Sequence, residues 1–263
     1  MSDQPLELPE PLQSFSTLAV PLGALLNDAD ACAARFRQSR TSGKILPNTL
    51  EALRIELTYH SNAIEGSTLS LRETQLVIEG KAPAGEKSLR EIYEARNHDR
   101  ALRIIERWAA EKPATPITDQ DLLDVHAQVL AEIDNGMAGQ FRSERVRIAG
   151  SGFIPPGSHK FVALIPKMIE LANRARIHPV LQAAELHYNL VAIHPFNDGN
   201  GRTARLMMNH HLLRHGYPYA IIEIGERGRY LAALDEANAT KPRAFAELVI
   251  SGIMRTCGKL LME

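Results

Sequence analysis

Apolar residues recur along most of the chain at every third or fourth position, which is the spacing of an amphipathic α-helix. The last such stretch is the most regular, because an apolar residue stands at every fourth position: Phe245, Val249, Ile253, Cys257 and Leu261. A second stretch with helical spacing holds Ile92, Ala95, Leu102, Ile105 and Trp108. The pattern predicts a mostly α-helical fold.

Three stretches open with residues that are typical of a helix N-terminus. A Ser, Thr or Asn side chain can cap the first turn, and an acidic residue three positions later can bond back to it. The pairs with this spacing are Asn48 and Glu51, Ser88 and Glu91, and Thr118 and Asp121. We therefore expect a helix to begin at each pair.

Two segments depart from the helical pattern. Residues 1–16 contain three prolines, and we expect a loose extended arm there: Pro5, Pro9 and Pro11. Residues 141–164 combine β-branched residues, glycines and a Pro-Pro pair. This composition predicts a short β-hairpin flap, with residues 146–149 paired to residues 161–163 around a Gly/Pro tip.

Composition excludes several classes of protein. The chain has 263 residues, of which 44% are apolar, which is enough for a substantial buried core. Its 30 basic and 31 acidic residues give a net charge of −1, which argues against a nucleic-acid binder and a polybasic membrane anchor. No apolar run approaches the roughly 20 residues of a membrane span, and we expect no signal peptide at the acidic, proline-rich start.

Only two cysteines occur, Cys32 and Cys257, and they lie far apart in the sequence. Such a pair predicts neither a disulfide framework nor a zinc cluster, and it suits the reducing cytosol. The helical position of Cys257 favours a buried thiol over a reactive one. We therefore expect a cytoplasmic protein.

The candidate chemistry lies in residues 183–215. Their apolar positions predict a helix that ends at His194, because Pro195 disfavours the α conformation at the residue before it. We expect the side chain of Phe196 to be buried in the core beneath the following turn. Five residues suited to unusual φ/ψ angles come next, and a second helix is expected from near Arg202.

This arrangement suits a ligand with several phosphate groups. A helix N-terminus presents unpaired N–H groups and about half a positive charge. Gly199 and Gly201 let a ligand approach the backbone closely, and Arg202 and Arg205 add two permanent cations. The same segment supplies a hard oxygen ligand of the kind that Mg²⁺ prefers and an imidazole able to act as a general base: Asp198 and His194.

Residues 194–205 read His-Pro-Phe-Asn-Asp-Gly-Asn-Gly-Arg-Thr-Ala-Arg. This run resembles the Fic-domain signature, HPFx[DE]GNGRxxR, at every defined position, and the resemblance extends over about residues 115–250. It implies a helical Fic fold with a hairpin flap. It also implies a protein adenylyltransferase, which moves AMP from ATP to a Ser, Thr or Tyr hydroxyl of another protein or of itself and releases pyrophosphate.

The resemblance further implies roles for single residues. His194 would accept the proton of the attacking hydroxyl, and Asp198 would hold Mg²⁺ against the α- and β-phosphates. Arg202 would contact the β-phosphate and Arg205 the γ-phosphate. The flap tip would border the nucleotide and dock the target: Ser151, Gly152 and Phe153. The implied ATP-binding set, in which residues 199–201 form the anion hole, is Asp198, Gly199, Asn200, Gly201, Arg202, Thr203, Ala204, Arg205, Tyr230, Leu231 and Asn238.

An upstream segment, residues 61–66, resembles the inhibitory motif of the same family, [ST]xxxE[GN]. Ser61 and Glu65 are four positions apart and share a helix face, and Gly66 is expected to end that helix. If Glu65 pairs with Arg205, a carboxylate stands where the γ-phosphate should bind. Like charges about 4 Å apart at an effective dielectric near 20 cost on the order of 4 kcal/mol, so this contact would act as a brake.

The resemblance divides the chain into two parts. Residues 1–110 would form an N-terminal helical extension that carries the inhibitory helix at about 58–66. Residues 111–263 would form the catalytic core, with the flap at about 146–163. The implied partners are ATP, Mg²⁺ and a protein substrate with a hydroxyl side chain, and the family allows a homodimer.

Other functions remain to be weighed against this one. Histidines crowd residues 187–215, which could indicate a metallohydrolase, but the sequence contains no HExxH zinc motif. It also contains no GxxxxGK[ST] motif, so a P-loop nucleotide site is not indicated. A non-catalytic nucleotide-binding module would be favoured by loss of His194 or Asp198, and both are present. Glu65 could instead orient a water molecule for removal of AMP, so that reaction stays an alternative.

Overall fold

The computed structural model describes residues 8–83, 85–148 and 151–261. These residues form helices and irregular segments but no β-strand, and none of the helices is both long and apolar enough to cross a membrane. The predicted mostly α-helical fold is confirmed. The elements are η1 (Ser16–Leu18), α1 (Gly23–Thr41), α2 (Pro47–Ile64), α3 (Leu71–Ile78), α4 (Leu89–Glu111), α5 (Asp119–Leu130), α6 (Ser158–Ala172), α7 (Pro179–Ile193), α8 (Asn200–Arg214), η2 (Ile224–Glu226), α9 (Arg227–Asn238) and α10 (Arg243–Leu261).

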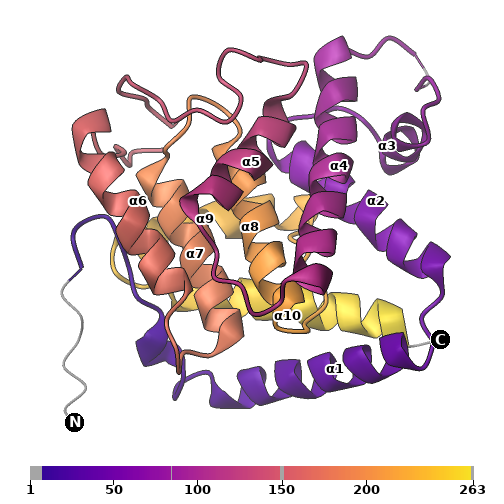
Figure 1. Cartoon of the computed structure of the whole chain (residues 1–263), viewed down its shortest axis with the longest axis horizontal. Helices are drawn as coiled ribbons and strands as arrows, with labels where there is room; N and C mark the ends of the chain where they lie inside the picture. The colour runs from indigo at the N-terminus through magenta and orange to yellow at the C-terminus, as the bar shows by residue number, and fades with distance from the viewer. Residues whose placement is uncertain (1–7, 84, 149–150, 262–263) are drawn as a thin grey trace.

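Helix α8 runs through the centre of the bundle, where it packs against α7, α4 and α5 (Figure 1). Nearly every side chain of α8 up to Leu212 is buried, including the polar ones, and buried polar groups need partners inside the protein. Asn209, for example, donates to the carbonyl of Arg205 and accepts from the N–H of Ala220. Packing against α7, α4 and α5, together with such internal hydrogen bonds, therefore fixes the position of α8.

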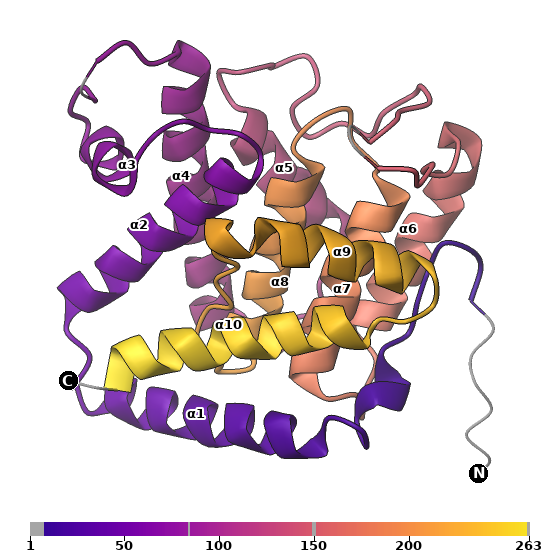
Figure 2. The ribbon, with the colours of Figure 1, turned by 180° about the vertical axis from the view of Figure 1, so that it is seen from behind.

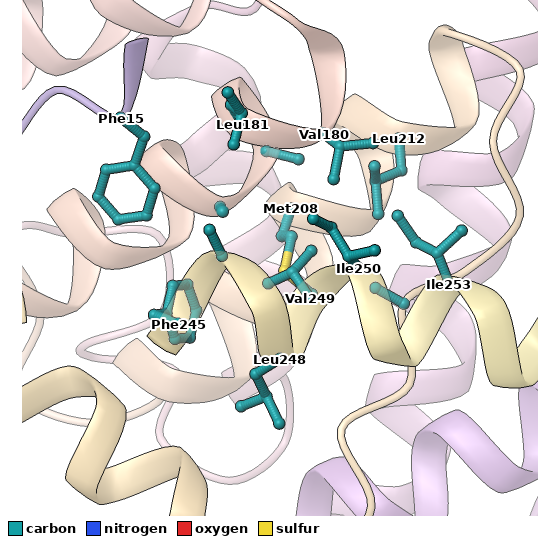
Figure 3. Packing of buried hydrophobic residues seen from close by; sticks show 14 of the residues in the cluster. Phe15, Val180, Leu181, Met208, Leu212, Phe245, Leu248, Val249, Ile250 and Ile253 are labelled. Carbon is teal, nitrogen blue, oxygen red and sulfur yellow. The ribbon is translucent and has the colours of Figure 1, made fainter. Parts of the chain in front are cut away.

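Two clusters of buried apolar side chains flank α7 and α8. One cluster joins them to α1, α9 and α10, and Met208 lies there beside Val249 and Ile250 (Figure 3). The other cluster joins them to α2, α4, α5 and α6. Helices α1, α2 and α4 thus share a core with the helices of the motif, and the predicted division at residue 110 stays a prediction.

The two cysteines form a disulfide, so the predicted free thiols are wrong. Cys32 lies on α1 and Cys257 on α10, two helices that run side by side (Figure 2), and the two Cα atoms are 6.1 Å apart. A separation of 225 residues hid this contact in the sequence, because helical periodicity does not show which helices pair. The expectation of a cytoplasmic protein rested in part on unpaired cysteines, and it loses that support.

Two of the three predicted helix starts are confirmed. Reciprocal hydrogen bonds cap α4 and α5: Ser88 with Glu91, and Thr118 with Asp121. The predicted cap at Asn48 is wrong, because α2 begins one residue earlier at Pro47. Proline is favoured at the first helical position, where its fixed φ suits the helix and its missing N–H is not needed.

The predicted hairpin flap is wrong for the residues that the structure describes, because residues 161–163 lie in α6. The buried face of this helix follows the i, i+3, i+4, i+7 period: Phe161, Leu164, Ile165 and Met168. That period outweighs the β-branched residues around it. Residues 151–157 have no regular structure, and Ala149, the end of one predicted strand, lies outside the described residues.

The N-terminal arm is not loose from residue 8 onward, and Pro5 lies outside the described part. Leu12 and Phe15 are buried, and the N–H of Phe15 donates to Oε2 of Glu185 on α7 at 2.8 Å. Glu185 is itself buried and lies 2.6 Å from Nη2 of Arg174. A buried aromatic ring and a buried carboxylate therefore anchor this segment, which its prolines alone did not indicate.

Loss of the Cys32–Cys257 disulfide should lower the free energy of unfolding by about 2–4 kcal/mol, because the cross-link restricts the unfolded chain. Urea unfolding with and without a reductant measures the difference. The Cys257→Ser variant without reductant should unfold like the reduced protein. Identical unfolding midpoints for the oxidised and reduced protein would contradict the prediction.

Candidate active site

The histidine of the motif lies at the end of α7. The helix ends at Ile193, and His194 has φ 51° and ψ 58°, in the left-handed region. The following proline disfavours the right-handed conformation at this position, and the predicted helix end is confirmed. The N–H of His194 donates to the carbonyl of Leu190 at 2.9 Å. The chain then turns away from α7 into the loop that leads to α8.

The tautomer of His194 follows from its contacts. Nδ1 lies 3.2 Å from the carbonyl oxygen of Val191, which can only accept, so Nδ1 carries the proton and Nε2 does not. Burial lowers the pKa of this imidazole and outweighs the hydrogen bond to Val191, which would raise it. His194 is therefore neutral near pH 7 and can accept a proton at Nε2.

Buried side chains shape the loop between α7 and α8. Phe196 is fully buried, as predicted, and stacks on His126 of α5 with ring centres 3.6 Å apart. Asn200 bonds the main chain of Phe196 twice: Nδ2 donates to the carbonyl at 2.8 Å, and Oδ1 accepts from the N–H at 3.0 Å. Gly199 precedes α8 with φ 75°, a conformation that glycine adopts readily. The loop thus has one defined shape.

His126 ties the same loop to α5. Its Nδ1 accepts from the N–H of Gly139 at 3.1 Å, so its Nε2 carries the proton and donates to the carbonyl of Asp198 at 3.0 Å. Burial lowers the pKa of His126 to about 4, so the ring stays neutral near pH 7. This neutral hydrogen bond holds the main chain of Asp198 in place.

Two cavities adjoin at the motif. The first, of about 300 Å³, is lined mainly by apolar and aromatic side chains, among them Phe153, Tyr230 and Leu234. The second, of about 370 Å³, is lined by the loop between α7 and α8 and by Arg147 and Arg202. The residues that border both are Ile64, Glu65, Ile148, His194, Gly201 and Arg227. An apolar compartment therefore leads into one that is lined by arginines and carboxylates.

Glu65 stands where the cavities adjoin, and it binds Arg205 as the sequence suggested. Oε1 of Glu65 accepts from Nη2 of Arg205 at 2.7 Å, and Ser61 accepts from the same guanidinium through its hydroxyl and its carbonyl, both at 2.9 Å. Burial alone would lower the pKa of Arg205, but Glu65 and Tyr230 raise it. Oε1 lies so close to the backbone that a Cβ on Gly201 would come within 2.2 Å of it.

Arg202 is neutralised by two acids. Its guanidinium lies 3.2 Å from Oδ1 of Asp198 and 3.0 Å from Oε1 of Glu94 on α4. Arg90, also on α4, pairs with Glu94 at 3.0 Å and with Oδ2 of Asp198. The four side chains close a ring of alternating charge. This ring connects α4 to the N-terminus of α8.

Asp198 keeps its charge within this ring. Burial would raise its pKa, but Arg202, the N–H of Gly199 and Arg90 together lower it. Its side chain is 43% exposed and lines the second cavity. One exposed carboxylate beside a phosphate-sized space fits Mg²⁺, which usually binds through one or two carboxylates and substrate phosphates. Within the described residues, no group of three or more His, Cys, Asp or Glu side chains could hold a metal alone.

Comparison with known proteins identifies the family. A sequence profile of the Fic/DOC family matches residues 116–212. Among solved structures, residues 134–508 of Fic-1 from C. elegans superpose with a TM-score of 0.79 at 30% identity, over 92% of this chain and 73% of that one. This chain belongs to the Fic/DOC family.

Curated relatives in this family are similar in sequence but longer. Protein adenylyltransferase Fic from Culex quinquefasciatus is 39% identical over 205 residues, which are 77% of this chain and 40% of that protein. The protein of the same name from Drosophila melanogaster is 38% identical over 194 residues, 73% of this chain and 39% of the relative. The chain thus spans about 40% of the length of these relatives.

Most of the predicted site residues of this Fic-family chain line the two cavities: Glu65, Ser151, Phe153, His194, Asp198, Gly199, Asn200, Gly201, Arg202, Tyr230, Leu231 and Asn238. Arg205 and Ser61 are buried and joined to Glu65. Thr203 and Ala204 are fully buried in the core, and Gly152 is outside the lining. The part of α8 beyond Arg202 thus serves packing more than contact with the cavities.

Sequence reasoning missed several residues that line the cavities or close the ring, among them Arg90, Glu94, Arg147 and Arg227. Arg227 begins α9, donates from Nε to the carbonyl of Ile64 at 2.9 Å, and borders both cavities. Neither family pattern, at residues 61–66 or 194–205, contains these residues. Each of them lies far in the sequence from the loop between α7 and α8. The only local signal was the i, i+4 spacing of Arg90 and Glu94, which is common on exposed helix faces.

Replacing Gly199 with alanine should lower the free energy of unfolding by about 1–2 kcal/mol, because a side chain is strained in the left-handed region. The added Cβ would also lie 3.3 Å from Cγ1 of Val129. Gly228→Ala on α9 is the matched control, since its Cβ would meet nothing within 4 Å. Urea unfolding compares the variants. Equal midpoints for both would count against the described loop.

Proposed function

We propose that this protein transfers AMP from ATP to the hydroxyl group of a protein side chain and releases pyrophosphate. The observation that carries the proposal is the unprotonated Nε2 of His194 beside the junction of an apolar cavity and an arginine-lined one that also holds Asp198. The names of the curated relatives, protein adenylyltransferase Fic, support the same reaction.

The chemistry of the two cavities suits ATP. The first, bordered by Tyr230, Leu231 and Asn238, would take the adenine base, whose flat ring buries well among aromatic and aliphatic side chains. The second would take the phosphates, because helix N-termini and arginines bind phosphate oxygens. Arg202 borders this cavity directly. Arg205 would reach the γ-phosphate once Glu65 leaves it.

The transfer itself needs a base and countercharge. Nε2 of His194 would accept the proton of the target hydroxyl as the hydroxyl oxygen bonds to the α-phosphorus. The bond from the α-phosphorus to the bridging oxygen would break, and its electron pair would leave with pyrophosphate. The α8 N-terminus and Arg202 would stabilise the developing charge. A positioned base contributes about 10²–10⁴-fold in rate.

Asp198 would hold Mg²⁺, because its carboxylate borders the phosphate cavity. The ion would supply positive charge against the phosphate oxygens. Arg90 would then have to release Oδ2 of Asp198, and it would keep Glu94 as its partner. The charge ring can thus open at Asp198 without leaving an arginine unpaired.

Glu65 would hold the enzyme inactive. Its carboxylate borders both cavities and is paired with Arg205, the cation that the γ-phosphate would need. A phosphate placed beside it would meet a like charge, which raises the free energy of the bound state. The position of Glu65 is supported from α9, where Arg227 bonds the last carbonyl of α2.

The segment between α5 and α6 would dock the protein target. Ser151 and Phe153 of this segment border the first cavity together with His194. A target hydroxyl bound against them would lie near the base. The homodimer, the cytoplasmic location and the lack of a nucleic-acid partner stay predictions.

Glu65→Gly should raise the affinity for ATP, and the rate of AMP transfer, by about 10–100-fold. The change frees Arg205 and removes a like charge, and water screens part of the effect because the Glu65 side chain is 40% exposed. Calorimetry measures ATP affinity, and labelled AMP on the enzyme and on lysate proteins measures transfer. Glu79→Gly, at the C-cap of α3, is the matched control.

Each result of this comparison has a distinct meaning. The double variant Glu65→Gly with His194→Ala should bind ATP and transfer no AMP. Equal ATP affinity in the wild type and Glu65→Gly would show that Glu65 does not inhibit ATP binding. Loss of AMP from a modified protein, with no transfer by any variant, would favour removal of AMP as the reaction.

AMP transfer should persist below pH 6.5, the ordinary pKa of histidine being about 6.5. Burial lowers the pKa of His194, so the neutral form that accepts a proton stays populated as the pH falls toward that lower pKa. The rate of transfer by Glu65→Gly at saturating ATP, followed over pH, measures the midpoint. A loss of activity centred at or above the ordinary value would contradict this assignment.

A further inference from the structure

Arg142 is a buried charge in the segment between α5 and α6, outside every motif considered above. The residue is 3% exposed. Its guanidinium carbon lies 4.7 Å from the centre of the Phe161 ring, a cation–π contact. Each hydrogen bond that the guanidinium makes within the described residues ends on a main-chain carbonyl: those of Glu144, Pro156, Ile193 and His194. A buried cation with such partners orders the backbone around it.

One set of these bonds holds the turn at His194. Nε of Arg142 donates to the carbonyl of His194 at 2.7 Å, and Nη2 lies 3.5 Å from that of Ile193. The main-chain N–H of Arg142 donates to the carbonyl of Pro195 at 2.9 Å. The last carbonyls of a helix lack partners within it and favour a nearby cation. A left-handed, non-glycine residue persists only where its surroundings hold it, and Arg142 does so here.

The other set closes the loop that borders the first cavity. Nη1 donates to the carbonyl of Glu144 at 2.5 Å and Nη2 to that of Pro156 at 2.6 Å, so the two ends of the loop meet at one guanidinium. Ser151 and Phe153, which lie between those ends, line the cavity. One planar side chain therefore connects the loop to the main chain of His194.

We propose that Arg142 is a positioning residue that fixes the His194 turn and the two loop ends at Glu144 and Pro156 in one arrangement, so that the base faces the place where a target hydroxyl docks. The catalytic part of this inference rests on the proposed function. Arginine presents its donors in a rigid planar fork that reaches carbonyls on two segments, whereas the single ammonium group of lysine cannot reproduce that fork. The charge of Arg142 also adds to burial in lowering the pKa of His194.

Arg142→Lys in the Glu65→Gly background tests the proposal, because it keeps the charge and removes the fork. Trypsin cleavage after Arg145 and Arg147 should rise by about fivefold or more, since the loop ends are released. The rate constant for AMP transfer should fall by about fivefold or more, while the affinity for ATP, measured by calorimetry, changes by less than about threefold.

Arg174→Lys is the matched control. Arg174 is 15% exposed, pairs with Glu185, bonds the carbonyl of Leu171, and lines neither cavity. Smaller effects of Arg142→Lys on cleavage or on transfer, or equal effects of Arg174→Lys, overturn the proposal. If the Glu65→Gly parent neither binds ATP nor transfers AMP, the proposed function fails, and the trypsin result still decides whether Arg142 holds the loop.

A measurement on the unsubstituted protein applies even if Arg142→Lys does not fold. The Nε–H of Arg142 is buried and bonded to the carbonyl of His194, so it should exchange slowly with solvent in nuclear magnetic resonance spectra. Rapid exchange of that proton overturns the arrangement. Slow exchange together with intact folding of the wild type supports it.

Discussion

The guanidinium of Arg205 is buried, and burying a charge costs free energy unless polar or charged partners surround it. Its side chain is 2% exposed and lies between α2 and α8. In the structure its anionic partner is the carboxylate of Glu65, and in the proposed reaction it would be the γ-phosphate of ATP. Leaving a buried charge without a counterion is strongly unfavourable, so the proposed function has the phosphate replace the carboxylate at Arg205. In the proposed function, inhibition and ATP binding would therefore meet at a single side chain.

The other arginine in the first turns of α8, Arg202, is also paired with acids. It lies between Asp198 of the preceding loop and Glu94 of α4, and Arg90 completes the ring. Helices α2 and α4 precede the residues that match the family profile, yet they supply the acids that face both cations. Helices α2 and α4 are therefore part of the site and share its core.

Stationary and movable parts of the site are held by different interactions. The loop main chain is fixed by neutral and buried bonds, from His126 to Asp198 and from Asn200 to Phe196. Glu65, by contrast, is held by charge at a side chain that is 40% exposed. Water and an incoming anion can compete for such a contact, whereas they cannot reach the buried amide and imidazole bonds. In the proposed function, this contrast would let Glu65 leave Arg205 while the loop keeps its shape.

Local sequence determined the helix that ends at His194, the glycine turn and the helix after it, because these depend on neighbours within a few positions. The pairing of Glu65 with Arg205 was also within reach, since two short family patterns pointed to it. Tertiary packing alone decided the rest: the disulfide between α1 and α10, the ring that joins Arg90 to Asp198, and the place of Arg142. It also made residues 161–163 helical, because burial of one face of α6 outweighed their β-branched neighbours. Periodicity tells which face of a helix is apolar, but it does not tell which helix that face will meet, and every one of these contacts depends on that choice.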